Sequence, residues 1–310
     1  MLVLIATWRE RSLHRPNKHF IACLAVADLL VGLFLAPLKL YQLPINQDLS
    51  YKLQYKMPIH LCRFVVWIDT FGLTTSIYTL TFISFDRYLK ISKPLKYMYL
   101  MTNSRAKKIV FAIVLISTAF ATYSATPLSK SAGILATGSV GPCFTMDSKY
   151  FYLVLIVSMF LLPTLVISIM YALIFRVAHK RQKMLRNGDM GQTNINLQQR
   201  TASSTLRQDM KVIRMLVIIM GVFLLCWSPW FISVTNWVFA DHSNSSEWIE
   251  NPSRWYEVNI ILQAVNTPPL FNSLCNPIIY AWLDQTYREA FKHLFHQTIS
   301  WFGSRFGRKN

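Results

Sequence analysis

The sequence predicts an all-α membrane protein, a bundle of seven transmembrane helices whose first helix is truncated at its N-terminus. Of the 310 residues, 53% are hydrophobic and only 15% are charged, whereas soluble domains average about 25% charged residues. The chain also contains six apolar runs, each near the length of roughly 20 residues that a helix needs to cross a bilayer. These runs are 20–40, 61–85, 109–127, 151–175, 215–239 and 258–282.

The first eight residues are apolar but too few to cross a membrane, and Arg9, Glu10 and Arg11 follow them. We interpret this stretch as the cytosolic end of a first helix whose outer part is missing. A cleaved signal peptide is the alternative, but in signal peptides the charges precede the apolar stretch. We therefore expect a transmembrane domain over 1–283.

The remaining residues, 284–310, predict a surface helix and a short cytosolic tail. Within 284–295, the apolar residues Tyr287, Phe291 and Leu294 share one helical face, with Arg288 and Lys292 beside them. This pattern is typical of an amphipathic helix that lies on the inner surface of a membrane and contacts its lipid.

The distribution of basic residues predicts the orientation. The formal net charge is +18, and 25 of the 32 Lys and Arg residues lie on alternate connections, namely 9–18, 86–108, 176–214 and 284–310. By the positive-inside rule that side is cytosolic. We expect a multi-pass protein of the plasma membrane with a cytosolic C-terminus. No nucleic acid is expected as a partner, because the charge is not gathered on a soluble face.

Two of the five cysteines, Cys62 and Cys143, fall on the outer, oxidising side, so a disulfide bond between them is plausible. The sequon at Asn244 lies on the same side and would allow glycosylation there.

An aspartate within a span is costly and suggests a function by default. Asp28 is in the middle of the first complete span, and hydroxyl and amide side chains on other spans are its candidate neighbours. Carboxylate, hydroxyl and amide oxygens together suit a small hard cation such as sodium. A water-filled hydrogen-bond network is the alternative. The candidate neighbours are Ser76, Asn272, Ser273 and Asn276.

Asp69 lies seven residues after Cys62, about two helical turns below the outer surface. A buried carboxylate without a partner is destabilising, and a cationic ligand arriving from outside would relieve that cost. Trp227, Trp230 and Phe231 could line the same cavity and offer cation–π contacts. Pairing with a polar side chain such as Asn266 is the alternative.

Arg87 lies at the cytosolic end of the same span, between Asp86 and Tyr88. Asp209 begins another span on that side, so an Arg87–Asp209 pair could hold two helix ends together and break on activation. The alternative is an arginine that simply extends to the membrane surface. Prolines 163, 229 and 277 interrupt later spans and weaken those helices locally.

Taken together, these residues resemble the rhodopsin-like (class A) family of G-protein-coupled receptors, over nearly the whole chain. The motifs stand in family order: the mid-span Asp28, Cys62, Asp86-Arg87-Tyr88, Cys143, Pro163 with Tyr171, Cys226-Trp227-Ser228-Pro229 and Asn276-Pro277-Ile278-Ile279-Tyr280. The resemblance implies a ligand pocket open to the outside and a cytosolic cleft for a heterotrimeric G protein.

The resemblance also implies roles for individual residues. Asp28 and its candidate neighbours match the family's sodium pocket. Ile77, Pro163 and Phe223 match a packing switch below the ligand. Arg87, Tyr171 and Tyr280 match the group that rearranges to admit the G protein, and Asp209 matches the acidic partner of Arg87.

Asp69 aligns with the aspartate that binds the ammonium group in biogenic-amine receptors. Phe231 and Asn266 also match positions that contact amine ligands. Thr70 and Leu73, on the same span as Asp69, are further expected ligand contacts. The hydroxyl groups of catechol-binding receptors are missing, since Leu155, Ile156 and Met159 occupy their positions, and Leu270 and Thr267 replace a tyrosine and a tryptophan. An amine with an apolar body is therefore the favoured ligand; a peptide and a nucleoside-like agonist are the alternatives.

Other classes of protein fit less well. A secondary transporter would show internal repeats, and a light-sensing opsin would need a lysine within 258–283, where none occurs. No pair of residues suggests catalysis within the membrane. We therefore expect that the protein is not an enzyme and that it binds no cofactor other than an allosteric sodium ion.

Overall fold

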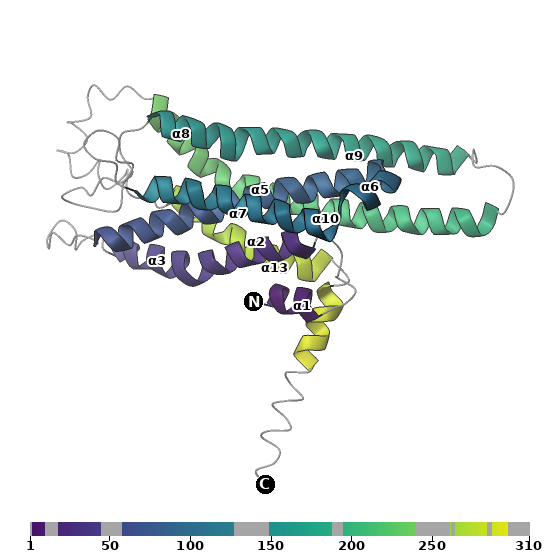
Figure 1. Cartoon of the computed structure of the whole chain (residues 1–310), viewed down its shortest axis with the longest axis horizontal. Coiled ribbons are helices and arrows are strands. Elements are labelled where there is room, and N and C mark those ends of the chain that lie inside the picture. Colours follow the sequence, from purple (N-terminus) through teal and green to yellow (C-terminus); the bar gives the residue numbers. More distant parts are fainter. Residues whose placement is uncertain are drawn as a thin grey trace, which may run out of the picture.

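The computed structural model describes residues 2–9, 18–44, 58–126, 149–187, 195–239, 261, 264–283 and 287–296. Almost all of these residues are helical, and the described part of the chain contains no strand. The helices lie side by side along one direction and form an elongated bundle (Figure 1).

The elements follow one another in the order α1 (Leu2–Arg9), α2 (Lys18–Leu30), η2 (Val31–Leu35), α3 (Ala36–Pro44), α5 (Ile59–Ser92), α6 (Pro94–Leu100), α7 (Asn103–Ala125), α8 (Lys149–Ile156), η4 (Val157–Leu161), α9 (Leu162–Asn187), α10 (Ile195–Phe239) and α13 (Pro268–Leu283). A further helical segment covers 287–296. The two η elements are short π-helical segments within longer helices.

Four helical stretches are long and apolar enough to cross a membrane: Lys18–Leu40, Asn103–Ala125, Tyr150–Lys180 and Ile213–Asn236. They coincide with four of the six predicted spans. The other two predicted spans are helical as well, in α5 and α13. α5 is richer in hydroxyl groups, and Thr74, Thr81 and Ser84 donate hydrogen bonds to carbonyls of their own helix. Such bonds let a polar side chain stay inside an apolar environment.

The predicted span 258–282 is divided at Thr267, where the helix is interrupted and α13 begins. Pro268 and Pro269 follow, and proline fits the first turn of a helix because its missing N–H has no partner there in any case. Leu270 N–H donates to the carbonyl of Thr267 at 3.1 Å and closes this first turn.

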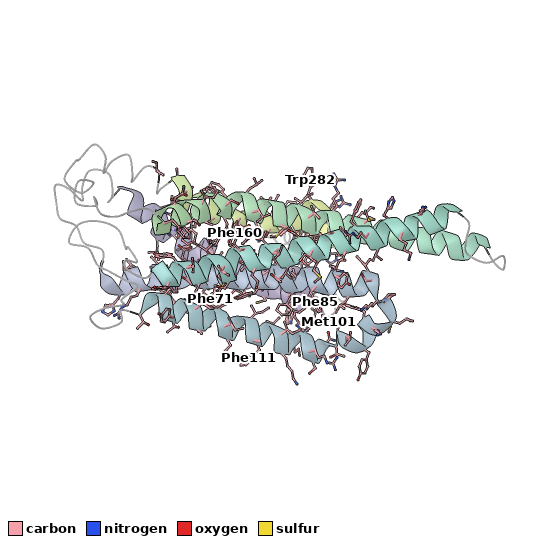
Figure 2. The ribbon with its side chains drawn as sticks, turned by 90° about the horizontal axis from the view of Figure 1, so that it is seen from above. Phe71, Phe85, Met101, Phe111, Phe160 and Trp282 are labelled. Atoms are coloured by element: carbon pink, nitrogen blue, oxygen red, sulfur yellow. The ribbon has the colours of Figure 1, made fainter. Side chains whose placement is uncertain are left out.

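The contacts between helices place α5 at the centre of the bundle, since it packs against α2, α7 and α9, while α10 packs on α13. The core contains Leu24, Ile77, Ile219 and Phe223, all almost completely buried. Outward-facing positions are apolar too: Phe111 is 68% and Trp282 is 79% exposed, and both lie at the margin of the bundle (Figure 2). A bundle that is apolar on both its inner and outer surfaces is the arrangement that lipid favours.

The short first helix, α1, packs against α2. Its Thr7 donates to the carbonyl of Val3 and shares a hydrogen bond of 3.0 Å with the hydroxyl of Tyr287. Tyr287 is 1% exposed and begins the segment 287–296, in which Phe291 and Leu294 also pack on the core. The predicted amphipathic pattern therefore has its apolar face against the bundle in the described part.

Candidate functional site

The carboxylate of Asp69, which we expected to meet a cationic ligand, lies in an ion pair within the protein. Nζ of Lys39, on α3, is 3.0 Å from Oδ2 of Asp69, on α5. The two side chains are 22% and 33% exposed, so neither is sealed in the core. Lys39 was not among the partners that we expected from the sequence, although its place in the last turn of the predicted span 20–40 was a signal for it.

The path of the α2–η2–α3 run brings Lys39 to this position. A π-segment adds a residue to a turn and so rotates all the side chains beyond it in the helix. η2 also lies very close to α5, because Gly72 has no side chain: a Cβ there would be 2.6 Å from Cγ2 of Val31. On α5, Asp69 therefore lies about one helical turn from this close approach of η2.

We expect Gly72→Ala to destabilise the protein by about 1–3 kcal/mol, the usual cost of overpacking a core. The added methyl group would force η2 away from α5 and lengthen the Lys39–Asp69 pair. Thermal unfolding of the purified protein in detergent measures the effect. Gly32→Ala, on η2 itself, is the matched control because a Cβ there meets nothing within 4 Å. Equal stability of the two variants would contradict this prediction.

An aromatic cluster forms beside α5 from Phe160, Trp227, Trp230 and Phe231. The rings of Phe160 and Phe231 are stacked with centroids 4.3 Å apart, and Trp230 meets Phe231 edge-on at 5.0 Å. Trp227 and Trp230 are perpendicular at 6.1 Å. Phe160, on η4, is a member that we did not predict, and it lies between the helices of the bundle (Figure 2).

The ion pair and the aromatic cluster are related through the buried core. Leu73 follows Asp69 by one helical turn and belongs to the same buried core as Trp227 and Phe231. The walls nearby are apolar: Leu155, Ile156 and Met159 are buried. The hydroxyl of Ser158 donates to the carbonyl of Val154 in its own helix. A ligand whose polar group bound Asp69 would thus meet apolar side chains with the rest of its body.

Two of the expected ligand contacts lie further round the bundle. Thr70 accepts a hydrogen bond of 3.0 Å from Ser124, so its side chain is turned toward α7. Asn266 lies half-buried immediately before α13. Leu270, where we noted the missing tyrosine, packs in a small apolar cluster with Val31 and Leu35.

A second polar site contains Asp28, which is hydrogen-bonded to two of the neighbours that we expected. Nδ2 of Asn276 donates to Oδ2 of Asp28 at 2.9 Å, and Ser273 also hydrogen-bonds this carboxylate. Asp28 is 7% exposed, and Ser76 and Asn272 are similarly buried. Among the described residues, Oδ1 of Asp28, Asn272 and Asn276 has no hydrogen-bond partner. Three buried oxygens without donors fit a bound cation.

Below the aromatic cluster, the three residues of the expected packing switch are all buried. Ile77 and Phe223 are both 0% exposed and belong to one core, and Pro163 is buried on α9. Phe223 contacts Trp227 at 6.2 Å between ring centroids. A movement of the Trp227 ring would therefore directly change the packing of Phe223.

The inner end of α5 carries a second set of polar contacts. The hydroxyl of Tyr97, on α6, donates to Oδ1 of Asp86 at 3.0 Å. Burial raises the pKa of the Asp86 carboxyl, while Arg87 and the bond from Tyr97 oppose that shift. The hydroxyl oxygens of Ser84 and Tyr171 lie 3.4 Å apart. Nε of Arg87 is buried without a partner among the described residues. The side chains of Asp209 and Tyr280 lie outside the described part.

The sequence of the chain matches that of one known family. The sequence corresponds to the family described as 7 transmembrane receptor (rhodopsin family) over residues 1–280. The chain belongs to this family. The protein is therefore a multi-pass membrane receptor and not an enzyme, and the resemblance inferred from its motifs is confirmed.

Individual receptors are similar to it at a moderate level. The octopamine receptor beta-2R of Chilo suppressalis is 29% identical over 94% of this chain and 74% of the relative. Trace amine-associated receptor 2 of Rattus norvegicus is 26% identical over 100% and 83%. The histamine H2 receptor of Rattus norvegicus is 27% identical over 96% and 75%.

The remaining predicted features are the disulfide bond and the glycosylation site. Cys62 is disulfide-bonded, and Cys23, Cys226 and Cys275 are free. Its predicted partner, Cys143, and the glycosylation sequon at Asn244 lie outside the described residues. Both assignments stay predictions.

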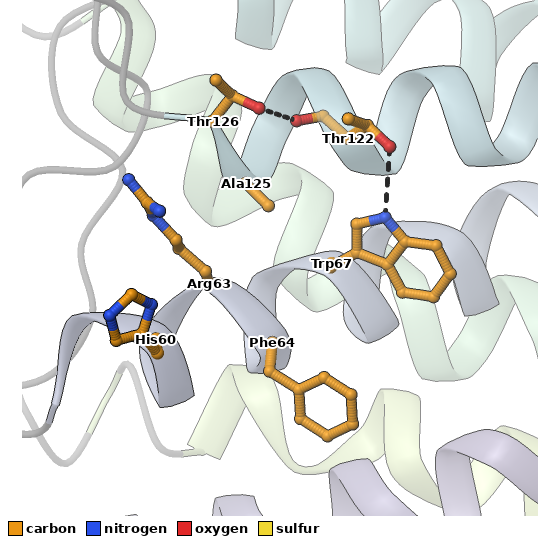
Figure 3. A pocket seen from close by; sticks show the side chains of 7 residues that line it. All are labelled: His60, Arg63, Phe64, Trp67, Thr122, Ala125 and Thr126. Atoms are coloured by element: carbon orange, nitrogen blue, oxygen red, sulfur yellow. Dashed lines mark hydrogen bonds between the residues drawn. The ribbon is translucent and has the colours of Figure 1, made fainter.

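An open cavity of about 470 Å³ lies between the start of α5 and the end of α7 (Figure 3). His60, Arg63, Phe64 and Trp67 line it from α5, and Nε1 of Trp67 donates to Thr122 on α7 at 3.3 Å. None of the residues that we predicted to bind ligand lines this cavity. His60 and Arg63 make its lining partly basic.

Proposed function

We propose that the receptor binds a small amine-containing cation at Asp69 from the outer side and transmits this event to a heterotrimeric G protein. The observation that carries the proposal is the partly exposed carboxylate of Asp69, one turn above an apolar core that includes Trp227 and Phe231. A carboxylate binds the ammonium group, and the aromatic faces stabilise the cation and its apolar body.

The relatives support the amine as ligand class. Three receptors named for octopamine, trace amines and histamine are similar to this chain over nearly all of its length. The apolar wall of Leu155, Ile156 and Met159 argues for an amine without a catechol ring. A peptide with a basic residue is the second candidate, since it could present the same cation.

A panel of amines tests the proposal in cells that express the receptor in their plasma membrane. Second-messenger responses, such as changes in cyclic AMP and calcium, are measured against cells without the receptor. We expect at least one amine to give a saturable response. If no amine acts while a basic peptide does, the second candidate replaces the first.

A sodium ion at Asp28 is part of the same proposal. Asp28, Ser76, Asn272, Ser273 and Asn276 would hold it. In support, Asn276 and Ser273 hydrogen-bond the Asp28 carboxylate, Ser76 and Asn272 are buried, and three side-chain oxygens of this set have no hydrogen-bond partner among the described residues. A bound cation would stabilise the packing of α2, α5 and α13 around it, and thereby oppose a rearrangement of these helices.

The inner end would pass the signal on to the G protein through Arg87, Tyr171 and Tyr280. We propose that Arg87 pairs with Asp209 in the inactive receptor and that the C-terminal segment 284–310 is cytosolic. The basic connections then face the cytosol, which also holds the G protein.

We expect Asp209→Ala to raise signalling without agonist several-fold, because it would remove the acidic partner of Arg87. An ion pair of this kind contributes up to about 1 kcal/mol, and a change of that size alters a two-state equilibrium about fivefold. The measurement is basal second-messenger output at matched surface expression. Asp209→Glu, which keeps the charge, is the control and should stay near the wild-type level. Unchanged basal output in Asp209→Ala would count against the pair.

A further inference from the structure

The ion pair between Lys39 and Asp69 restricts which amine the receptor can bind. Their charged atoms are 3.0 Å apart, and both side chains are partly exposed. The pair is electrically neutral before a ligand arrives. A ligand with a single positive charge would displace Lys39 from Asp69 and leave two cations beside one carboxylate, in a partly buried space.

The described surroundings do not offer Lys39 another acid. Asp69 is the carboxylate that contacts it, and the neighbouring apolar cluster consists of Val31, Leu35, Val65 and Ile68, with Leu38, Trp67 and Leu270 against it. His60 and Arg63, near the start of α5, add no negative charge there. A monocation that displaced Lys39 would therefore leave the Lys39 ammonium without a carboxylate among the described residues, and an unpaired charge in a partly buried place is costly.

On the basis of the proposed function, we propose that the natural ligand is zwitterionic. It is an amino-acid-like molecule whose ammonium group binds Asp69 and whose carboxylate binds Lys39. This ligand exchanges one ion pair for two and leaves the site neutral. Because the Lys39 and Asp69 charges are in direct contact, the two ligand charges must be close together, as they are on the single α-carbon of an amino acid.

The rest of the ligand is then apolar or aromatic. Leu73 lies one turn below Asp69 and shares its core with Trp227 and Phe231, and Phe160 stacks on Phe231. An aromatic side chain can pack edge-on or offset against such rings. The geometry thus selects an aromatic amino acid or a close derivative over its decarboxylated amine.

The test compares matched sets of probes on the intact receptor in cells kept in buffer free of amino acids. Each set contains an amine, the corresponding amino acid and the amino-acid amide: phenethylamine with phenylalanine and phenylalaninamide, and likewise for the tyrosine, tryptophan and histidine series. The amide keeps the size of the carboxyl group but not its charge. Second-messenger responses give the potency of each probe.

We expect the amino acid of at least one set to be about tenfold or more potent than both its amide and its amine, a difference of about 1.4 kcal/mol. Lys39→Met should reduce this preference to less than about threefold, and Lys39→Arg, which keeps the charge, should retain it. Lys107→Met, at an exposed lysine of α7 outside the site, is the matched control and should leave every potency unchanged.

Other results overturn the proposal in distinguishable ways. If amine and amide equal or exceed the amino acid, and Asp69→Asn still removes their effect, the ligand is a simple amine: Lys39 then swings away, and the proposed function stands. If no probe in any set acts, or all act independently of Asp69, the amine site itself is refuted together with its zwitterionic form.

Discussion

Replacing Asp69 with asparagine is expected to lower the potency of an amine-containing agonist by about a hundredfold or more. Removing one member of a partly buried, hydrogen-bonded charge pair costs about 2–5 kcal/mol, and each 1.4 kcal/mol is a factor of ten in affinity. Asparagine keeps the shape of the side chain but cannot neutralise an ammonium group. Dose–response curves at equal surface expression provide the measurement.

The ion pair with Lys39 complicates the interpretation of that variant, because Asp69→Asn also leaves Lys39 without its carboxylate. The double variant Asp69→Asn/Lys39→Met removes both charges and is the necessary control. If the double variant recovers the response to a monoamine, the loss in the single variant came from repulsion by Lys39. A response that stays lost in both variants assigns the ammonium contact to Asp69 itself.

The second large expected effect is a dependence of agonist affinity on the sodium concentration. Agonist affinity in membranes from cells that express the receptor should fall several-fold as sodium chloride replaces choline chloride, and Asp28→Asn should abolish this dependence. The physical reason is linkage: an ion that stabilises one packing of α2, α5 and α13 opposes a ligand that favours another, with couplings commonly of about 5- to 150-fold. Competition binding at constant ionic strength measures it.

Thr79→Ala is the matched control for the sodium experiment. Thr79 is 0% exposed on α5 and donates weakly to Sγ of Cys23 on α2, so it lies in the same helix interface but contributes no oxygen to the cluster around Asp28. Its variant should keep the sodium dependence of the wild type. A wild-type receptor whose affinity does not change with sodium would refute the site outright.

Several features could be predicted from the amino-acid sequence without a structure. Apolar runs of about 20 residues must be helical in lipid, because a helix satisfies its own backbone hydrogen bonds there. The mid-span Asp28 had to find polar partners, and it does so with Asn276 and Ser273. The order of the motifs around Asp28, Arg87, Trp227 and Asn276 identified the family, which is confirmed.

The partner of Asp69 was decided only by the tertiary structure. Lys39 lies 11 residues after Asp28 (39 − 28), and at about 100° per residue a regular helix would return it to nearly the same face as Asp28. The π-segment Val31–Leu35 lies between the two and rotates the rest of the helix, including Lys39, and Gly72 allows α5 to approach it. Helical spacing therefore could not show which neighbour Lys39 meets.

Phe160 was missed for the same kind of reason. It lies within a second π-segment, Val157–Leu161, so its side chain does not follow the regular spacing of the span, and it stacks on Phe231 of a helix far along the chain. The sequence alone determined the helices, their expected orientation in the membrane and the family. The contacts of Lys39 with Asp69 and of Phe160 with Phe231 depended on the two π-helical segments. Such segments are set by the packing between helices, which the sequence of a single helix does not specify.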